Sequence, residues 1–370
     1  MQTVPRKEYK AMKKLNLAII GQGRSGRDIH GAYLKSDANK YFRVAAVVEE
    51  DAARRERAKA EYDGCDVYEN YRELFERHDI DLVVNASYSE QHFAITMDLL
   101  EHGMNVVSEK PMGRNRYECD TLIATAKKHG ATLMVFQQSL FAPFYQKTKE
   151  VIASGLIGDV LQASISYSGF SRRWDWQTLQ CKLAGVIYNT GPHPIGYALD
   201  LLGFPDDFSI PYSRLGRSEM IFGDAEDYAK ILITAPGKFP VDLEFSSTNP
   251  FNDYVIKVIG TRGTFKITAS GKYTVKYIIP GENVEKTVSK TFISNPDGTP
   301  AYCSEKLISH AEEGAIEGTA FDVGSDKFYA MAYDTLVNGT PLTIRPEDIA
   351  KVVSVIEIVH AQNPIPKTID

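Results

Sequence analysis

A glycine-rich turn between an apolar segment and a helical one constrains the fold of this chain more than any other feature. Residues 15–20 are an apolar run of strand length. Three glycines follow in a GxGxxG pattern, Gly21, Gly23 and Gly26, and a helical pattern comes next. In such a turn the first glycine permits a tight bend, the second lets the backbone approach a pyrophosphate, and the third lets the helix pack closely on the strand. The segment therefore predicts a dinucleotide-binding β-α-β unit.

The start of that helix and the end of the next strand extend the prediction. Phosphates bind at helix N-termini, so Arg24 and Ser25 are expected beside the pyrophosphate. The next strand, residues 42–48, ends at Glu49, near the spacing of about 20 residues expected for an acidic residue on the ribose hydroxyls. A carboxylate there repels the 2′-phosphate of NADP, so we expect NAD rather than NADP. Because two arginines follow closely, the sequence leaves open that Glu49 is a solvated acid at a helix start.

Length, charge and hydropathy limit the classes of protein to which the chain can belong. At 370 residues it most simply makes two domains, and a formal net charge of −6 gives no basic footprint for nucleic acid. Residues 1–14 are polar and rich in lysine, which excludes an ordinary secretory signal, and no apolar run reaches membrane-spanning length. We therefore expect a cytoplasmic protein with neither a nucleic-acid nor a membrane partner.

The cysteines indicate neither a metal site nor a disulfide framework. They are spread along the chain without CxxC or Cys/His pairing, at Cys65, Cys119, Cys181 and Cys303. Zinc sites need thiolates or imidazoles at short, paired spacings. We expect no bound metal and a reduced intracellular protein.

The pattern of strands and helices changes near residue 141. Before it, strand-length apolar runs alternate with helical patterns, as in a parallel, doubly wound sheet. After the first two strands come runs at residues 81–86, 105–108 and 132–136 and helical patterns at residues 93–102 and 117–129. We expect residues 14–140 to form this α/β domain.

Beyond residue 141 the chain is rich in short, β-branched segments separated by glycine, proline or asparagine. Helices are expected at residues 143–154, 194–202 and 346–360, and strands at residues 160–167, 227–234, 241–247, 254–259, 263–269 and 272–279. Short strands with such separators are typical of an antiparallel sheet. Residues 141–370 are therefore expected to form a second domain.

A lysine at the end of a predicted strand supplies the second chemical feature. Glu109-Lys110-Pro111 follows residues 105–108. Ligands bind at the carboxyl ends of the strands of an open α/β sheet, so Lys110 is expected at that edge. Alone, the tripeptide is only a charged turn. Downstream of an intact glycine fingerprint, it indicates nicotinamide redox chemistry.

These motifs, in their order, resemble those of a known family. The set consists of the glycine turn, Glu109-Lys110-Pro111 and the segments 87–92, 154–158, 191–193, 201–203 and 259–264. The order and spacing of these motifs agree from about residue 14 to residue 358. The set resembles the glucose-fructose oxidoreductase, inositol dehydrogenase and MocA family. The resemblance implies a Rossmann domain, a C-terminal α/β domain with a large, open, mostly antiparallel sheet, an active site between them and a homo-oligomer. It also implies an NAD(P)-dependent dehydrogenase or reductase acting on a CH–OH group of a sugar, polyol or glycoside.

The resemblance also implies roles for individual residues. Lys110 matches the family's lysine beside the nicotinamide, and His193 matches its catalytic histidine. His92 matches a position that sets the cofactor loop, so we do not expect it to be catalytic. Besides the glycine turn and Glu49, the expected cofactor-binding residues are Ser87, Tyr88, His92, Glu109 and Lys110.

Two positions depart from the family pattern. Asn189 stands where many members have aspartate, and Gly196 stands where an aspartate often follows the histidine. Asparagine can orient a substrate hydroxyl by hydrogen bonding but cannot take a proton at neutral pH. His193 is also expected to lack its usual orienting carboxylate. With residues 172–178, the run 189–194 nevertheless resembles one branch, associated with redox chemistry at the 3-position of glucosides, including C-glucosides of plant phenolics.

The chemistry needs a base near the reacting hydroxyl. Hydride leaves a carbinol carbon readily only as the hydroxyl proton is removed. His193 suits this task, with an ordinary pKa of about 6.5, while Lys110 can donate to the developing alkoxide. In the alternative, Lys110 is the base, its pKa lowered by partial burial and by the nicotinamide cation. The sequence favours His193 but does not separate the two.

A segment rich in arginine and tryptophan is expected to contact the substrate. Its non-periodic pattern favours a loop, although the tryptophans could instead belong to the core. Flat aromatic faces and arginine forks suit the apolar face and hydroxyls of a sugar ring or a phenolic aglycone. His30 is a weaker candidate for the site, and Lys182 is expected to be a solvated charge. The expected substrate-binding residues are Arg172, Arg173, Trp174, Trp176, Asn189 and His193.

The most specific function predicted from these features is oxidation of a glucoside-like pyranose at C3, or the reverse reduction of a 3-keto sugar. The amide of Asn189 presents a donor and an acceptor to vicinal hydroxyls, which suits a neutral ring. Three alternatives stay open: an inositol, polyol or aldose dehydrogenase; an NAD-dependent glycosidase that uses transient oxidation at C3; and a non-catalytic nucleotide-sensing protein.

Overall fold

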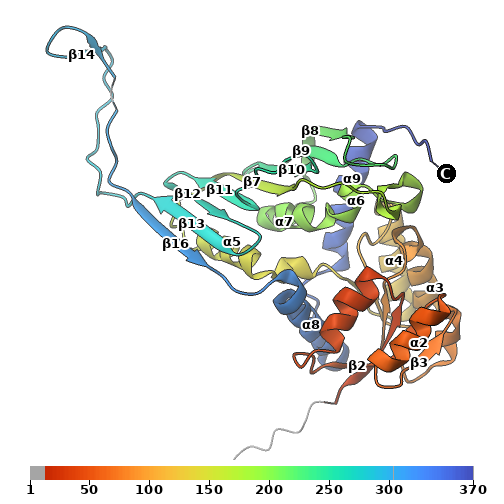
Figure 1. Ribbon diagram of the computed structural model, residues 1–370. Coiled ribbons are helices and arrows are strands. Elements are labelled where there is room, and N and C mark those ends of the chain that lie inside the picture. Colours follow the sequence, from red (N-terminus) through yellow and green to blue (C-terminus); the bar gives the residue numbers. More distant parts are fainter. Residues whose placement is uncertain (1–12, 303, 370) are drawn as a thin grey trace, which may run out of the picture.

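A six-stranded parallel sheet forms the N-terminal part of the molecule in the computed structural model, which describes residues 13–302 and 304–369 (Figure 1). Its strands lie in the order β3-β2-β1-β4-β5-β6. They are β1 (Leu15–Ile20), β2 (Phe42–Val48), β3 (Asp66–Tyr68), β4 (Leu82–Asn85), β5 (Val106–Ser108) and β6 (Leu133–Val135). The predicted parallel, doubly wound sheet is confirmed, and only the short β3 was not expected.

The strands of this sheet are short and apolar, as is typical of a sheet covered on both faces. Every residue of β4, β5 and β6 is buried. The strand order reverses between β1 and β4, so the loops that leave these strands diverge and open a crevice at their carboxyl ends. The connecting helices and turns are η1 (Arg24–Gly31), α1 (Ala32–Leu34), α2 (Ala52–Glu61), η2 (Tyr71–Glu76), η3 (Ser89–Gln91), α3 (His92–Glu101) and α4 (Arg116–His129).

A second sheet of eight strands follows, in the order β16-β13-β12-β11-β7-β10-β9-β8. Its neighbouring strands are antiparallel except for β7 and β10, which are parallel. The strands are β7 (Val160–Ser168), β8 (Ser209–Gly216), β9 (Tyr228–Thr234), β10 (Val241–Ser246), β11 (Ile256–Gly260), β12 (Gly263–Ile267), β13 (Lys272–Tyr277) and β16 (His310–Ala315). The prediction of a mostly antiparallel second sheet is confirmed.

The two edge strands, β8 and β16, were not predicted from the sequence. β8 contains Pro211 and has a single buried residue, and β16 has the sequence HAEEGA, with no β-branched residue. Edge strands bury little apolar surface and often carry charges or proline. Their sequences therefore lack the alternation that marks the central strands.

Helices cover one face of the second sheet (Figure 1). α5 (Pro143–Ala153) packs on β12, α7 (Pro192–Leu202) on β7 and β10, and α9 (Pro346–Gln362) on β8. Residues of β9 alternate between buried and partly exposed, so Ala229, Ile231 and Ile233 share one buried face of the sheet. The predicted helix at residues 194–202 begins two residues earlier, because Pro192 occupies the first turn, where a missing N–H is tolerated.

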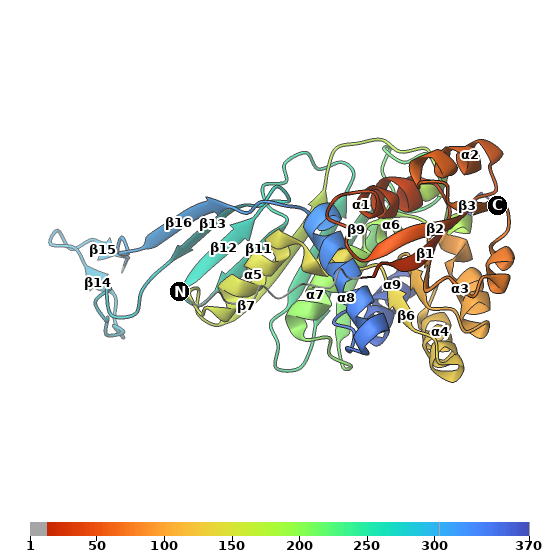
Figure 2. The ribbon, with the colours of Figure 1, turned by 90° about the horizontal axis from the view of Figure 1, so that it is seen from below.

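Helices near the C-terminus return to the first sheet. In α8 (Ser325–Asn338), which was not predicted, Tyr329 stacks on Tyr33 with 4.9 Å between ring centroids and meets Phe42 at 5.5 Å. α9 packs against α4. Figure 2 shows α8 next to β1 and β2. The division of the chain near residue 140 stays a prediction, and contacts with the first sheet extend into the last fifty residues.

No helix in the described ranges combines the length and the apolar character needed to cross a membrane. Cys65 and Cys119 are buried and Cys181 is partly buried, whereas Cys303 lies outside the described residues. Residues 1–12, on which most of the argument about a secretory signal rests, also lie outside them.

The remaining helical turns near the site are η4 (Gln138–Phe141), η5 (Trp176–Thr178), η6 (Gln180–Lys182), α6 (Val186–Asn189) and η7 (Ala320–Gly324).

Candidate active site

The glycine turn has the geometry that a dinucleotide requires. Gly21 has φ +90°, and a Cβ there would lie 2.5 Å from the carbonyl oxygen of Ala86. A Cβ on Gly26 would lie 1.9 Å from the carbonyl oxygen of Gly21. At Gly23, by contrast, no heavy atom lies within 4 Å of the Cβ position. Close packing therefore requires the first and third glycines, while the second faces open space where a pyrophosphate can approach the backbone.

Glu49 is held over this turn. Its carboxylate accepts hydrogen bonds from the backbone N–H of Gln22, at 2.7 Å, and of Asp51, at 3.1 Å. Asp51, not Glu49, caps helix α2, because its side chain accepts the N–H of Arg54 at 2.8 Å. Arg54 Nη1 lies 3.7 Å from Glu49 Oε2. The carboxylate retains lone pairs for further hydroxyl donors.

His92 joins the loop after β4 to the turn after β5. Its Nδ1 lies 2.9 Å from the carbonyl oxygen of Pro111, and its Nε2 lies 3.1 Å from the carbonyl oxygen of Ser87. Burial lowers the pKa of His92. Ser87 is also anchored, because its hydroxyl donates to Asn85 Oδ1 at 2.7 Å. Next in this loop, Tyr88 stays exposed at its edge.

Glu109 is buried at the centre of a hydrogen-bonded chain behind Lys110. Its Oε2 accepts the backbone N–H of Lys110 at 3.0 Å, and its Oε1 lies 3.2 Å from His30 Nε2. His30 Nδ1 lies 2.7 Å from the hydroxyl of Tyr329. Burial would raise the pKa of Glu109, but the hydrogen bond and charge of His30 and the charge of Lys110 outweigh it and lower the pKa to about 2. Glu109 is therefore a fixed negative charge, and His30 supports the site from behind.

Lys110 lies where the two parts of the chain meet. Its Nζ donates to the backbone carbonyl oxygen of Asn189 at 2.7 Å. Burial lowers the pKa of Lys110; the charge of Glu109 opposes this shift, and the positive charges of Arg24 and Arg173 add to it. Arg24 comes from the glycine turn and Arg173 from the segment after β7. The pKa of this one ammonium group is thus affected by charges from both the expected cofactor site and the expected substrate segment.

His193 stands on the first turn of α7, close to Lys110. Its Nδ1 lies 2.8 Å from the hydroxyl of Ser139, in η4. Burial, followed by the charge of Lys110, lowers the pKa of His193 to about 3. A Cβ on Gly196 would lie 2.9 Å from Gln137 Nε2, so an aspartate would displace that amide. Ser139 therefore orients the imidazole where the family pattern has a carboxylate.

Gln137 and Ser139 are site residues that the sequence analysis missed. Both follow β6, so the rule that selected Lys110, position at the carboxyl end of a parallel strand, also covers them. Gln137 Nε2 donates to the carbonyl oxygen of Pro192 at 2.7 Å, while its Oε1 is buried without a hydrogen-bond partner.

The side chain of Asn189 is partly committed to the protein. Its Nδ2 donates to the carbonyl oxygen of Gln177 at 2.7 Å, and its Oδ1 is buried without a hydrogen-bond partner. One of the two N–H bonds of the amide is therefore used within the protein, while its oxygen has no partner there. Buried Glu226 holds the start of α6 by accepting the N–H of Ile187 at 3.0 Å.

The arginine and tryptophan segment divides into inner and outer residues. Trp176 meets the ring of Tyr88 edge to face, with 5.1 Å between centroids. Arg173 pairs with Asp175 at 2.9 Å. Trp174 is 76% exposed, and the guanidinium of Arg172 lies 4.7 Å from the ring of Phe222. Trp176 and Arg173 are therefore close to the expected cofactor loop or to Lys110, while Arg172 and Trp174 lie farther out.

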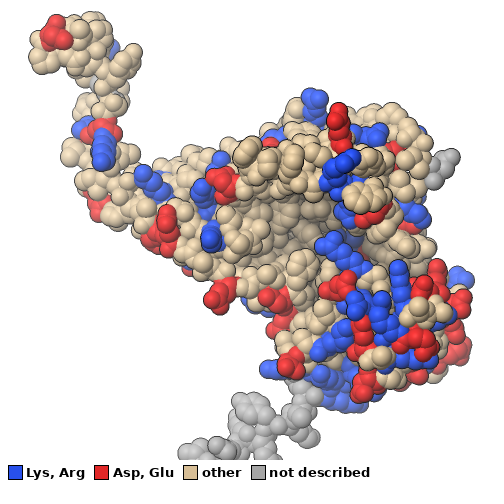
Figure 3. All heavy atoms as spheres, viewed as in Figure 1, with Lys and Arg blue, Asp and Glu red and all other residues tan. Residues whose placement is uncertain are grey.

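Lys182 is not simply a solvated charge. Its Nζ lies 2.7 Å from Glu90 Oε1 and 5.6 Å from the ring centroid of Tyr88. With Trp176, it ties the segment after β7 to the loop after β4. Figure 3 shows the surface hollowed between the charged part of the molecule that carries the first sheet and the part that carries the second.

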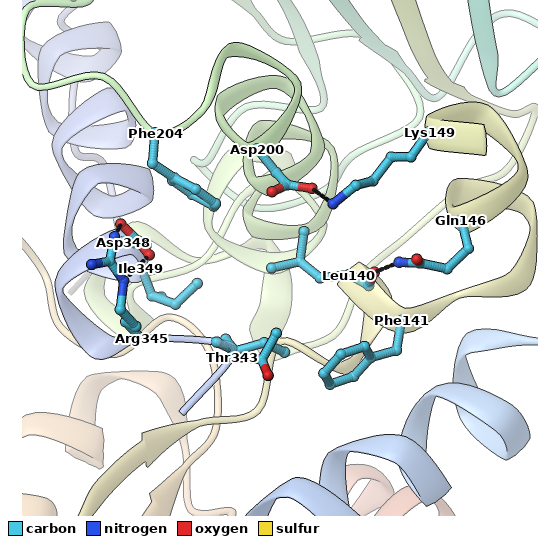
Figure 4. Close-up of a pocket in the computed structure, with 11 residues that line it drawn as sticks. Leu140, Phe141, Gln146, Lys149, Asp200, Phe204, Thr343, Arg345, Asp348 and Ile349 are labelled. Atoms are coloured by element: carbon cyan, nitrogen blue, oxygen red, sulfur yellow. Dashed lines mark hydrogen bonds and ion pairs between the residues drawn. The ribbon is translucent and has the colours of Figure 1, made fainter. Parts of the chain in front are cut away.

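A separate cavity of about 130 Å³ lies among α5, α7 and α9 (Figure 4). Its charged side chains are already paired: Lys149 Nζ lies 2.9 Å from Asp200 Oδ2, and Arg345 makes two contacts of 2.7 and 2.8 Å with Asp348. None of the residues singled out for chemistry lines this cavity. Among the described residues, no group of three or more histidine, cysteine, aspartate or glutamate side chains is placed to hold a metal ion.

Comparison with known proteins shows related chains with redox and sugar-related names. A 2,7-anhydro-N-acetylneuraminate hydratase of Mediterraneibacter gnavus is 25% identical over 260 residues, 69% of this chain and 68% of the relative. The scyllo-inositol 2-dehydrogenase (NADP⁺) of Bacillus subtilis is 26% identical over 193 residues, 52% of each chain.

Solved structures share the fold across nearly the whole chain. GenD2 from gentamicin A biosynthesis, solved in complex with NAD, has a TM-score of 0.75 at 21% identity and covers 97% of both chains. KijD10, a 3-ketoreductase of Actinomadura kijaniata solved with NADP and TDP-benzene, has a TM-score of 0.75 at 18% identity and covers 95% of this chain and 98% of the other.

Two family matches cover most of the chain. Residues 15–137 match the family described as "Oxidoreductase family, NAD-binding Rossmann fold", and residues 145–266 match the "GFO/IDH/MocA C-terminal domain". The expected resemblance is confirmed. The chain belongs to the glucose-fructose oxidoreductase, inositol dehydrogenase and MocA family of oxidoreductases and carries an NAD-binding Rossmann domain.

Proposed function

We propose that this oxidoreductase moves a hydride between NAD and a secondary hydroxyl or keto group of a sugar or glycoside, at C3 of a glucoside-like pyranose. The observation that carries the proposal is the hydrogen bond from Lys110 Nζ to the backbone of Asn189, which stands just before His193; the charge of the lysine lowers the pKa of that histidine. One residue follows β5 of the first sheet and the other begins α7 under the second. Two such groups in one site are suited to remove the proton from a carbinol hydroxyl or to return it.

The residues around the glycine turn fit the cofactor. Open space at Gly23 and the N-terminus of η1, with Arg24 and Ser25, would hold the pyrophosphate, and Glu49 would accept the ribose hydroxyls. When bound, NAD accepts or returns the hydride. The carboxylate of Glu49 favours NAD over NADP, because it repels a 2′-phosphate.

His193 is the proposed base. With its pKa lowered to about 3, the imidazole is neutral and able to accept a proton at every pH at which the enzyme would work. Ser139 occupies Nδ1, which leaves Nε2 for the substrate hydroxyl. An imidazole of low pKa is a weak base, so it needs help from a group that stabilises the alkoxide.

Lys110 is the proposed source of that help. Its ammonium is a compact donor with three N–H bonds, one of which goes to the carbonyl oxygen of Asn189. Another can donate to the substrate oxygen and stabilise negative charge where it develops. The lowered pKa of Lys110 also keeps the alternative open, in which the amine itself takes the proton.

The choice of C3 rests on the surroundings of these two groups. The unpaired Oδ1 of Asn189 can accept from a hydroxyl next to the reacting carbon. Trp176 offers an aromatic face at the cofactor loop. Arg173, whose Nε and Nη2 each donate to Asp175, offers its remaining N–H donors near Lys110. A neutral pyranose with hydroxyls on neighbouring carbons satisfies all three. Relatives named for anhydroneuraminate and scyllo-inositol support a substrate of this chemical class.

Isotope transfer tests the position of oxidation. Methyl and aryl glucosides labelled with deuterium at C2, C3 or C4 are incubated with the protein and NAD, and the nicotinamide is examined by NMR. We expect deuterium on the nicotinamide only from the C3-labelled sugars. Activity confined to inositols, to C1 of free aldoses or to an acyclic hydroxy acid would overturn the C3 assignment. Transfer from no substrate, with NAD bound, would favour the nucleotide-sensing alternative.

A second candidate function is glycoside cleavage through transient oxidation at C3. One observation favours it: a relative in this family is named a hydratase, a reaction class without net redox change. The same site would serve, because the hydride returns to the sugar after the substituent leaves. Release of an aryl aglycone without accumulation of NADH would identify this reaction, and stoichiometric NADH would identify a dehydrogenase.

A further inference from the structure

A long arm projects from the second sheet (Figures 1 and 2). β13 and β16 pair as far as Tyr277 and His310. The chain between them, residues 278–309, continues outward as two legs and turns at a short hairpin of β14 (Ile293–Ser294) and β15 (Pro300–Ala301). We call residues 278–309 the arm; of these, all but residue 303 are described.

Beyond Ile278, whose N–H donates to the carbonyl oxygen of Arg262 at 2.8 Å, the arm is held only by itself. Asn283 exchanges two hydrogen bonds with the backbone of Ile308, at 3.0 and 2.8 Å, and Lys286 lies 2.9 Å from Glu305. Every hydrogen bond and ion pair described for residues 279–309 has its partner between residues 279 and 310. No described residue of the arm is buried. The body of the chain therefore does not cover the arm's side chains.

The arm nevertheless carries large apolar side chains. Val288 is 86% exposed, Phe292 79% and Tyr302 95%. Ile279, Val284, Ile293, Leu307 and Ile308 are also exposed. Eight large apolar side chains are thus exposed within one short segment, and apolar side chains gathered in this way often mark an interaction site. If the arm only projected into solvent, polar side chains would be favoured along it.

We propose that the arm packs on a second copy of this chain, in a reciprocal exchange of arms. The arm has about the 20 to 30 residues that a stable interface uses on each side. In a two-fold pair each copy both gives and receives an arm, so one apolar segment contributes twice to the buried area. A second copy is also the one partner present at equal concentration wherever the chain is made. The arm leaves the sheet at the β13–β16 edge, away from α7, α9 and the site (Figure 1).

Sedimentation of the full chain tests the proposal. The protein with Val288→Asp and Phe292→Asp is compared with the unchanged protein and with a control, Tyr117→Asp, at a 77% exposed side chain of α4 outside the arm. We expect the unchanged chain and the control to associate alike. The arm variant should dissociate at concentrations about ten-thousandfold higher, because one buried apolar side chain contributes about tenfold or more and the two changes, present in both copies, remove four such side chains.

Cross-linking identifies what the arm touches. A photoreactive benzoylphenylalanine at position 292 is activated in a mixture of unlabelled and ¹⁵N-labelled chains. We expect a product of twice the chain mass in which the two peptides carry different labels. A monomeric unchanged protein at micromolar concentration, association that survives the arm substitutions, or cross-links confined to one chain would each overturn the proposal. These readouts are masses and are independent of hydride transfer, so they do not depend on the proposed function.

Discussion

The protonation state of His193 is the most direct check on the chemistry proposed for the site. An ordinary histidine has a pKa of about 6.5 and is about three-quarters protonated at pH 6. In this structure burial and the charge of Lys110 lower the pKa of His193 to about 3. At pH 6 only about one molecule in a thousand would then carry the proton. We expect His193 to remain neutral across pH 5 to 8.

Replacing Lys110 by methionine separates the two causes. The substitution removes the positive charge but retains an apolar chain of similar length, so burial remains. The pKa of His193 should rise and stay below 6.5, because burial is the larger cause. The matched control is Lys182→Met, which removes an ammonium paired with Glu90 that does not contribute to the pKa of His193.

Imidazole NMR of ¹⁵N-labelled protein measures both effects. The signals of His193 are assigned by their loss in His193→Gln, and the titration is followed while the fold persists. A midpoint between pH 6 and 7 in the unchanged protein would refute the reasoning, and so would a Lys110→Met variant in which His193 titrates as before. Either result would mean that the imidazole is more hydrated than its packing indicates.

The same shifts predict how stability responds to acid. The unfolded chain binds a proton at His193 near pH 6.5, whereas the folded chain binds it near pH 3, so this contribution is complete above about pH 6.5 and falls as the pH drops towards 3. The pKa of Glu109 is lowered from 4.5 to about 2 on folding. Its carboxylate therefore stabilises the fold above about pH 4.5, and this contribution is lost as the pH falls towards 2. Urea titrations at pH 7, 5 and 4 should therefore show progressively lower free energies of unfolding.

Three further results are expected. Glu49→Ala narrows the preference for NAD over NADP in binding titrations, because it removes the carboxylate that repels a 2′-phosphate; tighter NADP binding by the unchanged protein would contradict the assignment. Lys110→Ala and His193→Ala each slow single-turnover hydride transfer by about 10²- to 10⁴-fold with NAD affinity largely intact, and near-normal transfer in either variant would remove that residue from the proposed mechanism. Tyr329→Phe deletes the buried hydroxyl 2.7 Å from His30 and lowers the free energy of unfolding by about 1–3 kcal/mol in urea, whereas the control Tyr117→Phe, at an exposed side chain outside the arm, leaves it unchanged.

Local patterns in the sequence were sufficient for the first sheet, the glycine turn and the position of Lys110. The strands β1, β4, β5 and β6 are mostly apolar, and the three glycines stand where the backbone turns and packs. Each of these features is formed by residues that are close to one another in the sequence. Sequence spacing therefore encodes them directly.

The residues that surround Lys110 and His193 were set by contacts between distant parts of the chain. His30 meets Tyr329 across 299 positions, and Ser139 meets His193 across 54. One N–H of Asn189 donates to the carbonyl oxygen of Gln177, and α8, β8 and β16 were not predicted. Periodicity reports which face of an element is buried, but not what is packed against it. The hydrogen-bond partners and the pKa values of the site depend on that packing, so only the assembled fold decides them.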